Sequence, residues 1–170
     1  MTHPTPTEHE KRSRLRKILN DAKTAFMVTR TTSGGLHGRP MATVQIEDDF
    51  DNLWFPTDRN SGKVRELVAD SEVCLGYTNA TGSEWASVNG RARIADDRAL
   101  IRELWSPIWK NWFDSPEDSR LVLIGVTPES AEYWDSGSQI LQMIKFAVTA
   151  VTGKRLGEGE NEHVNLSSVH

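Results

Sequence analysis

Apolar residues alternate with polar ones along much of this chain, which is the pattern of β-strands with one buried face. The clearest run covers 84–95, where apolar or small side chains stand at every second position from Ala86 to Ile94. Turn-forming glycine, proline and acidic residues separate it from shorter runs of the same kind. The other strands are predicted at 25–31, 38–46, 53–55, 72–79 and 121–126, with the last extended past Pro128 to Trp134.

Helical spacing of apolar residues appears before and between these strands. Thr7 and Glu10 have the spacing of a capping box, so a first helix is expected to begin at Glu8. Its apolar stripe consists of Leu15, Ile18 and Leu19. The remaining helices are predicted after Ser61 to near Asp70, after a cap at Asp96, and over 139–151. Pro107 argues against one continuous helix through the tryptophans that surround it.

The order and spacing of these elements favour an antiparallel sheet. About six or seven short strands are joined mostly by connections that are too short for parallel crossovers. The predicted fold is therefore a β-barrel with flanking helices, in the α+β class. At 170 residues the chain is long enough for one domain with its own core. We place that domain at 1–152, with a loose arm at 1–6 and a glycine-rich, charged tail at 153–170 that is expected to be disordered.

The stretch 54–67 combines the end of a strand, a short loop and the start of a helix. Pro56 cannot donate a ladder hydrogen bond, so the strand is expected to stop there. Thr57 and Ser61 supply hydroxyl groups, and Lys63 adds a positive charge in the first helical turn. Free N–H groups and the positive end of the helix dipole lie at the same place. These features predict a site for a phosphate monoester. A polar turn followed by a capped surface helix is the alternative.

Other residues bear on such a site. Arg39 begins a predicted strand and is either a solvated charge or a bidentate phosphate ligand. Gly90 lies within a strand, which predicts a bulge or the close approach of a ligand or of backbone. Trp105, Trp109 and Trp112 are either core residues, or they wall a planar ring or a dimer interface.

Composition argues against several classes of function. A net charge of −4 disfavours a general nucleic-acid binder, which needs a basic face. The single cysteine, Cys74, excludes an intrachain disulfide and a cysteine zinc site, and no metal-binding or hydrolase motif is present. The first residues hold no apolar signal region, and the apolar pattern at 140–151 is too short to span a bilayer. We therefore expect no membrane partner, no metal and a cytoplasmic location.

Five motifs occur in order between Leu15 and Asp135. They are G-R-P-M at 38–41, F-x-T-x-x-x-S-x-K-x-x-E-L at 55–67, S-V-N-G-R-A-R-I-A-D-D at 87–97, W-F at 112–113 and E-Y-W-D at 132–135. As an ordered set they resemble the pyridoxamine 5'-phosphate oxidase-like flavoproteins, and most of all the general stress protein 26 branch. The resemblance implies an antiparallel FMN-binding split barrel, in which two subunits pair and flavin mononucleotide (FMN) lies in the groove between them.

The resemblance also implies which residues contact the cofactor. The FMN phosphate is expected near Arg39, Thr57, Ser61 and Lys63. The ring is expected beside Pro40, Met41, Trp54 and Phe55, with Gly90 and a Trp112 from the partner chain completing the pocket. Flavin adenine dinucleotide (FAD) stays open as an alternative cofactor, and haem or a deazaflavin is a less favoured one.

One departure from the family limits the reaction. True pyridoxamine phosphate oxidases carry an Arg-x-His pair on a late strand, where this chain has Tyr133 and Trp134. We therefore do not expect it to oxidise pyridoxamine phosphate. The resulting hypothesis is a homodimeric, FMN-dependent small oxidoreductase whose substrate and electron partners are unknown. The alternative is a stress protein that binds flavin for storage or sensing without turnover.

Overall fold

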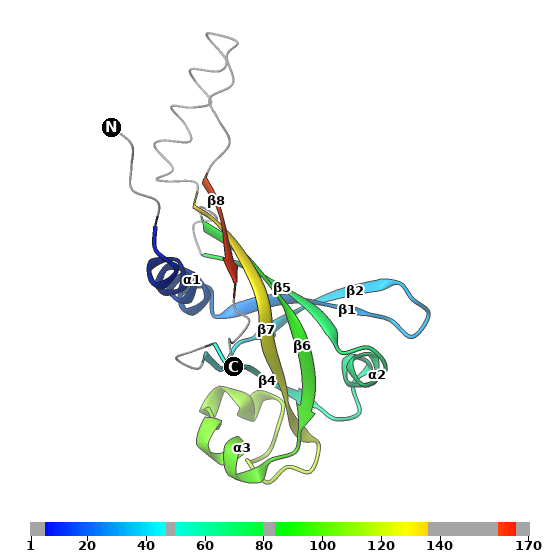
Figure 1. The fold of residues 1–170 in the computed structure, drawn as a ribbon. Helices are drawn as coiled ribbons and strands as arrows, with labels where there is room; N and C mark the ends of the chain where they lie inside the picture. Colours follow the sequence, from blue (N-terminus) through cyan, green and yellow to red (C-terminus); the bar gives the residue numbers. More distant parts are fainter. Residues whose placement is uncertain (1–5, 47–49, 80–83, 136–159, 166–170) are drawn as a thin grey trace, which may run out of the picture.

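The computed structural model describes residues 6–46, 50–79, 84–135 and 160–165. Eight strands form one antiparallel sheet in the order β2-β1-β5-β6-β7-β4-β3, with β8 beside β7 (Figure 1). The strands are β1 Thr24–Arg30, β2 Leu36–Ala42, β3 Gln45–Ile46, β4 Leu53–Asp58, β5 Glu72–Thr78, β6 Glu84–Ala95, β7 Leu121–Asp135 and β8 Glu160–Asn165.

Helices flank this sheet, as the sequence predicts. They are α1 Glu8–Ala22, α2 Gly62–Ala69, α3 Arg98–Leu104 and the 3₁₀-helix η1 Pro107–Asn111. Figure 1 shows α1 at one flank of the sheet, α2 at the other, and α3 at the end where β4, β6 and β7 meet. The predicted antiparallel barrel-type fold with flanking helices is confirmed.

The sheet curls until its two ends approach each other. Strands β2 and β4 are in contact, although they lie near opposite ends of the strand order. No ladder of hydrogen bonds joins β2 to β4 in the described part of the chain. We call the line where these two strands face each other the seam.

The predicted single strand at 38–46 is wrong, because the chain crosses the seam within it. Strand β2 pairs with β1, whereas β3 pairs with β4 at the other end of the sheet. Between them, Thr43 N donates to Lys23 O over 3.0 Å and Val44 N donates to Trp54 O over 2.9 Å. The change of partner strand divides one apolar run into two strands.

The main core lies between α1 and the inner face of the sheet. Thr7 and Glu10 form the predicted capping box: Thr7 Oγ1 accepts from Glu10 N over 3.3 Å, and Glu10 Oε2 accepts from Thr7 N over 2.7 Å. The helix that they begin buries the predicted stripe completely. Its core partners include Met27, Leu75 and Val88, and the stripe itself is Leu15, Ile18 and Leu19.

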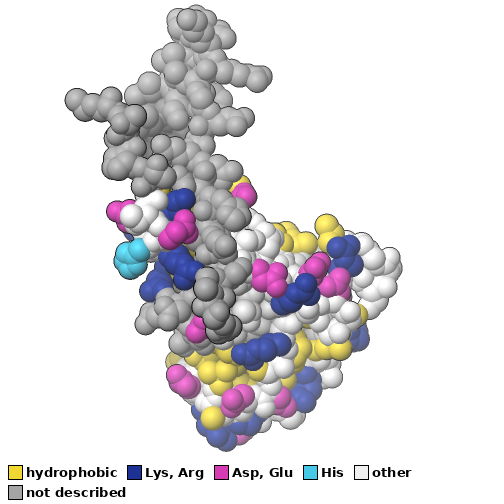
Figure 2. Space-filling model, viewed as in Figure 1, with side chains coloured by type: hydrophobic (Ala, Val, Ile, Leu, Met, Phe, Trp, Pro, Cys, Tyr) yellow, Lys and Arg dark blue, Asp and Glu magenta, His cyan; other side chains and the backbone are white. Residues whose placement is uncertain are grey.

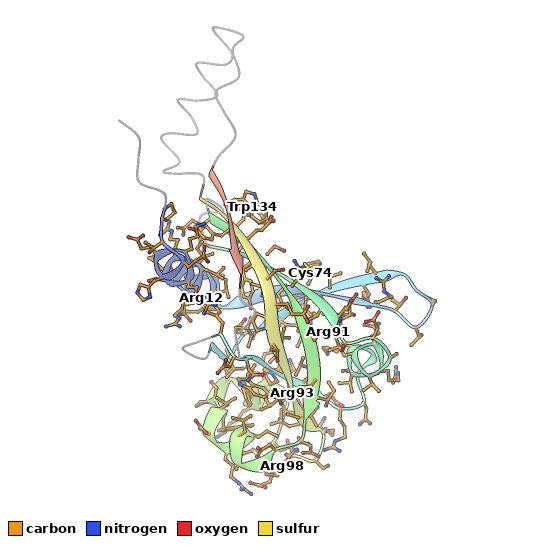
Figure 3. All side chains as sticks on the ribbon, viewed as in Figure 1. Arg12, Cys74, Arg91, Arg93, Arg98 and Trp134 are labelled. Carbon is orange, nitrogen blue, oxygen red and sulfur yellow. The ribbon has the colours of Figure 1, made fainter. Side chains whose placement is uncertain are left out.

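A second core packs beneath α3 and η1. Trp109 lies there with Trp54, and Trp105 contacts Trp109 edge to face with ring centroids 5.5 Å apart. Pro107 begins η1, so the helix breaks where predicted. The predicted cap at Asp96 is wrong, because Asp97 Oδ1 accepts from the first-turn N–H groups of α3. Asp96 instead pairs with Arg59 and with Arg98, which is labelled near α3 in Figure 3.

The predicted end of the strand at Pro56 is also wrong. Strand β4 continues through Pro56 to Asp58. Only Leu53 and Trp54 of β4 pair with β3, so β4 is an edge strand at Pro56, where a missing N–H is tolerated.

Strand β8 lies within the tail at 153–170 that was predicted to be disordered, so that prediction is wrong for 160–165. Strand β4 pairs with β7 only over 121–126, which leaves a backbone edge free further along β7. Strand β8 pairs with that edge over 130–135. The predicted turn at 80–83 and the predicted helix at 139–151 lie outside the described residues, and within them no helix is both long and apolar enough to span a bilayer.

Candidate functional site

A pocket of about 460 Å³ opens at the seam. One wall is the end of β2, and the other is the end of β4 with the first turn of α2. The residues after η1 and just before β7 close its rim. This seam pocket is lined by Pro40, Met41, Ala42, Pro56, Thr57, Asp58, Lys63, Trp112, Phe113 and Arg120.

Helix α2 begins after Ser61, as the sequence predicts, although the loop before it is shorter than predicted because β4 runs to Asp58. Ser61 has the extended backbone of an N-cap residue, and α2 begins at Gly62. The Ser61 side chain accepts no hydrogen bond from the helix; its Oγ lies 3.4 Å from Thr57 Oγ1. The first-turn N–H groups of a helix have no intrahelical acceptors. Those of Gly62 and Lys63 are therefore donors that a ligand can use.

Lys63 is a partly buried cation on the pocket wall. Within the described residues it has no hydrogen bond or ion pair. Burial lowers the pKa of Lys63, and the nearby charge of Arg39 lowers it further, while Asp58 and Glu66 act in the opposite direction. Its positive charge is therefore not fully compensated, as expected of a residue that receives an anion.

Arg39 lies behind the pocket rather than on its lining. Its Nη2 donates to Glu66 Oε2 over 2.6 Å, and its Nη1 donates to Thr29 Oγ1. Thr29 Oγ1 donates to the same Glu66 oxygen over 2.6 Å. Burial would raise the pKa of Glu66, but hydrogen bonds from Thr29, Arg39 and His37 outweigh it and lower that pKa. Arg39 therefore belongs to a buried, ionised cluster.

Arg120 and Asp58 are pocket residues that the sequence analysis missed. Arg120 makes a bidentate pair with Asp118, whose pKa the hydrogen bonds from Arg120 lower to about 2. The Arg120 guanidinium also lies 6.0 Å from the ring centroid of Phe113. The only sequence signal for Arg120 is a single arginine before an apolar strand, which is a common arrangement.

Trp54 and Phe55 are buried away from the seam pocket. Trp54 packs its ring on Gly125, where a Cβ atom would lie 2.5 Å from the ring. Arg93, labelled in Figure 3 on β6, stacks over that ring at 4.7 Å. Phe55 is fully buried in the main core. Neither side chain lines the pocket in this chain.

Gly90 also lies elsewhere. The register of β6 and β7 shifts at Asn89 and Gly90, and a Cβ at Gly90 would lie 2.3 Å from Thr127 O. Both the predicted bulge and the close approach of backbone are therefore present. Gly90 lines a separate hollow of about 340 Å³ with Cys74, which shares no lining residue with the seam pocket.

Trp112 lines the seam pocket of its own chain, whereas the resemblance places it in the partner's pocket. Its side chain is 62% exposed, and Ile108 on η1 is exposed as well. Trp112 and Phe113 therefore form an aromatic rim, with Arg120 beside Phe113. Five of the ten predicted site residues come together in the lining, namely Pro40, Met41, Thr57, Lys63 and Trp112, and Ser61 adjoins them through Thr57.

Comparisons with known proteins identify the family of this chain. The model of the pyridoxamine 5'-phosphate oxidase-like family matches residues 10–157. Protein bli-3 of Neurospora crassa is 33% identical over 151 residues, which are 82% of this chain and 72% of that protein. General stress protein 26 of Bacillus subtilis is 26% identical over 125 residues, which are 72% of this chain and 86% of that protein.

Among solved structures, the general stress FMN/FAD binding protein of Xanthomonas citri superposes with a TM-score of 0.68 at 25% identity. The match covers 77% of this chain and 92% of that one. The curled sheet is therefore the split barrel that the sequence resemblance implies.

Proposed function

This chain belongs to the pyridoxamine 5'-phosphate oxidase-like family, and on that premise we propose that it binds FMN in the seam pocket. The observation that carries the proposal is Lys63, a partly buried cation without a partner among the described residues. Leaving such a charge in a pocket costs free energy unless an anion meets it. The name of the Xanthomonas citri protein, which includes FMN/FAD binding, supports the same class of ligand.

We assign the phosphate of FMN to the α2 end of the pocket. Lys63, the hydroxyl groups of Thr57 and Ser61, and the free N–H groups of the first helical turn converge there. A cation, hydroxyl donors and a helix N-terminus together suit a phosphate dianion. The phosphate of FMN is terminal, whereas that of FAD continues into a second nucleotide. A cradle for a terminal phosphate therefore favours FMN.

We assign the flavin ring to the apolar part of the lining. Pro40 and Met41 form one side, and Trp112 and Phe113 form the rim. Planar aromatic ligands pack well on such surfaces. Trp54 and Phe55 contribute the strand that leads to Pro56 and Thr57, rather than their own side chains.

We propose that the protein is a small oxidoreductase of unidentified substrate. The redox chemistry would be that of the flavin, and the protein positions the ring and holds its phosphate. Tyr133 is buried, and Tyr133 and Trp134 stand where pyridoxamine phosphate oxidases carry their Arg-x-His pair. The substrate is therefore not expected to be pyridoxamine phosphate.

We also propose that the chain pairs with a second copy through the outer face of its sheet. Phe26, Leu36 and Trp85 are 54%, 72% and 51% exposed. The strand registers, in which Phe26 lies opposite Gly76 and Trp85 opposite Thr78, place all three on the face that points away from the main core. Large exposed apolar side chains on one face are typical of an interface. Figure 2 shows one face of the molecule, on which hydrophobic side chains lie among acidic and basic ones.

The absorption spectrum tests the proposal directly. Purified protein reconstituted with FMN and freed of unbound cofactor is expected to keep a flavin spectrum at about one FMN per chain. Bleaching of this spectrum by a reduced nicotinamide, followed by recovery with an electron acceptor, supports an enzyme. Bound flavin that no donor bleaches supports a binding protein instead. A spectrum without flavin overturns the proposal.

A further inference from the structure

Thr29, Arg39 and Glu66 form a compact polar cluster inside the protein. They come from β1, β2 and α2, and all three are joined by the hydrogen bonds described above. Thr29 is 1% exposed, and the side chains of Arg39 and Glu66 are 15% and 12% exposed. His37 adds a contact of 3.4 Å between its Nδ1 and Glu66 Oε1. The cluster is too buried for ordinary surface pairing.

The cluster lies directly behind both walls of the seam pocket. Arg39 immediately precedes the β2 wall, which begins at Pro40. Glu66 follows Lys63 by three residues in α2, so the two side chains lie on one side of that helix. No ladder joins β2 to β4 among the described strands. The Arg39–Glu66 pair is a direct polar link between the β2 wall and the helix that carries Lys63.

We infer that this cluster is a latch across the seam, with Glu66 and Arg39 as positioning residues that hold Lys63 at the phosphate end of the pocket. The inference rests on the proposed flavin site. Arg39 is not among the residues that line the seam pocket, and each of its terminal nitrogens donates to Thr29 or Glu66, so we take Arg39 to act on the phosphate by fixing α2 rather than by touching it. A direct Arg39–phosphate contact is the rival account.

A charge-neutral double variant separates the two accounts. R39M/E66L removes one positive and one negative charge together, and apolar side chains of similar volume often replace a buried ion pair without loss of stability. The readout is the ratio of the dissociation constants for riboflavin and FMN, which measures phosphate recognition alone. If Arg39 only positions α2, packing between the two apolar side chains replaces the ion pair as the link to α2, and the double variant keeps this ratio within about twofold. A drop of tenfold or more, as expected for loss of a charge-assisted bond, overturns the latch.

A second variant keeps the test decisive if the double variant does not fold. T29V is uncharged and nearly isosteric, and Thr29 does not line the seam pocket. It removes the hydroxyl that accepts from Arg39 and donates to Glu66, and leaves their direct pair only partly satisfied in a buried place. A partly satisfied buried network holds its elements less firmly than a complete one, so the latch account predicts a lower phosphate preference, by roughly three- to tenfold. The rival account predicts no decrease, because Arg39 keeps its place and gains a free donor. An unchanged or increased ratio in T29V therefore contradicts the latch.

Two controls separate failure of the latch from failure of the flavin site. R14M/E84L replaces a partly buried pair that links α1 to β6, far from the seam in the strand order, and is expected to leave the ratio unchanged. Wild type must prefer FMN and K63A must lose that preference if the proposed site is right. If both hold and T29V still matches wild type, only the latch is wrong.

Discussion

The Ser61 hydroxyl lies 3.4 Å from the Thr57 hydroxyl and caps none of the N–H groups of the helix that it precedes. Serine at an N-cap usually accepts one of these hydrogen bonds, which stabilises a protein by about 1 kcal/mol. Here the N–H groups of Gly62 and Lys63 are left for another acceptor. A capping residue that leaves these donors open is consistent with the phosphate site that we propose.

S61A is therefore expected to change binding more than stability. The free protein should lose well under the usual ~1 kcal/mol of a helix cap. FMN affinity should fall by about two- to tenfold, the value of a neutral hydrogen bond. Thr7 is the matched control, because its side chain does cap α1. T7A should lower the free energy of unfolding by about 1 kcal/mol and leave FMN binding unchanged. The opposite pattern would show that Ser61 is a structural cap.

W112A is expected to weaken FMN and riboflavin equally. Trp112 lines the pocket while its side chain is 62% exposed, so its loss removes ring contact without opening a core cavity. An aromatic contact of about 0.5–1.5 kcal/mol corresponds to a two- to tenfold loss for both ligands. W109A is the contrast, since Trp109 is 2% exposed and its removal should cost roughly 3–5 kcal/mol of stability. A loss confined to FMN in W112A would show that the phosphate, rather than the ring, lies beside Trp112.

FMN affinity is expected to depend on pH at both ends of the range. The pKa of Lys63 is lowered from 10.5 by burial and by Arg39, so affinity should fall as pH rises through that lowered value. Affinity should also fall below about pH 6, where the phosphate loses its second charge. Riboflavin should show neither change. The measurement is a fluorescence titration of each ligand over a series of pH values. Identical pH profiles for FMN and riboflavin would show that neither Lys63 nor the phosphate controls binding.

The lowered pKa of Lys63 also has a consequence for the free protein. Between the folded-state pKa and 10.5 the unfolded chain binds more protons than the folded one, so Lys63 makes stability rise with pH over that window. Chemical denaturation at a series of pH values gives the free energy of unfolding of wild type and of K63A. The difference between the two isolates the contribution of Lys63. If the free energy of unfolding of wild type relative to K63A fell as pH rose through this window, the lowered pKa of Lys63 would be contradicted.

The protein is expected to be a dimer that F26D disrupts. Phe26 is 54% exposed on the outer face of the sheet, and a carboxylate in an apolar interface is costly. Light scattering should give about twice the 19.1 kDa chain mass for wild type and a lower mass for F26D. V68D is the control, because Val68 is exposed on α2 rather than on this face. A wild-type monomer at micromolar concentration would contradict the interface.

The local signals in the sequence predicted those parts of the fold that depend on neighbours along the chain. The capping box of α1, the period-two strand that became β6, and the run from Thr57 through Ser61 to Lys63 are of this kind. Each is decided within a few residues by hydrogen-bond geometry or by the spacing of apolar side chains.

Features that depend on distant partners were not predictable in the same way. Pro56 continues its strand because β3 pairs with only two residues of β4, and Trp54 is buried because α3 and η1 cover it. The Arg39–Glu66 pair joins residues 27 apart in the chain, and no local pattern distinguishes it from a solvated arginine and a helix-surface glutamate.

The most direct test of the account compares four dissociation constants, those of wild type and K63A for FMN and for riboflavin. Loss of a charge-assisted bond worth about 1.5–3 kcal/mol should weaken FMN by roughly ten- to a hundredfold and leave riboflavin nearly unchanged. The free fold should be unaffected, because alanine is a good helix residue and Lys63 has no partner among the described residues. K110A, at an exposed lysine on η1 outside the pocket lining, should match wild type for both ligands. Equal affinity of wild type and K63A for FMN would contradict the proposed phosphate site.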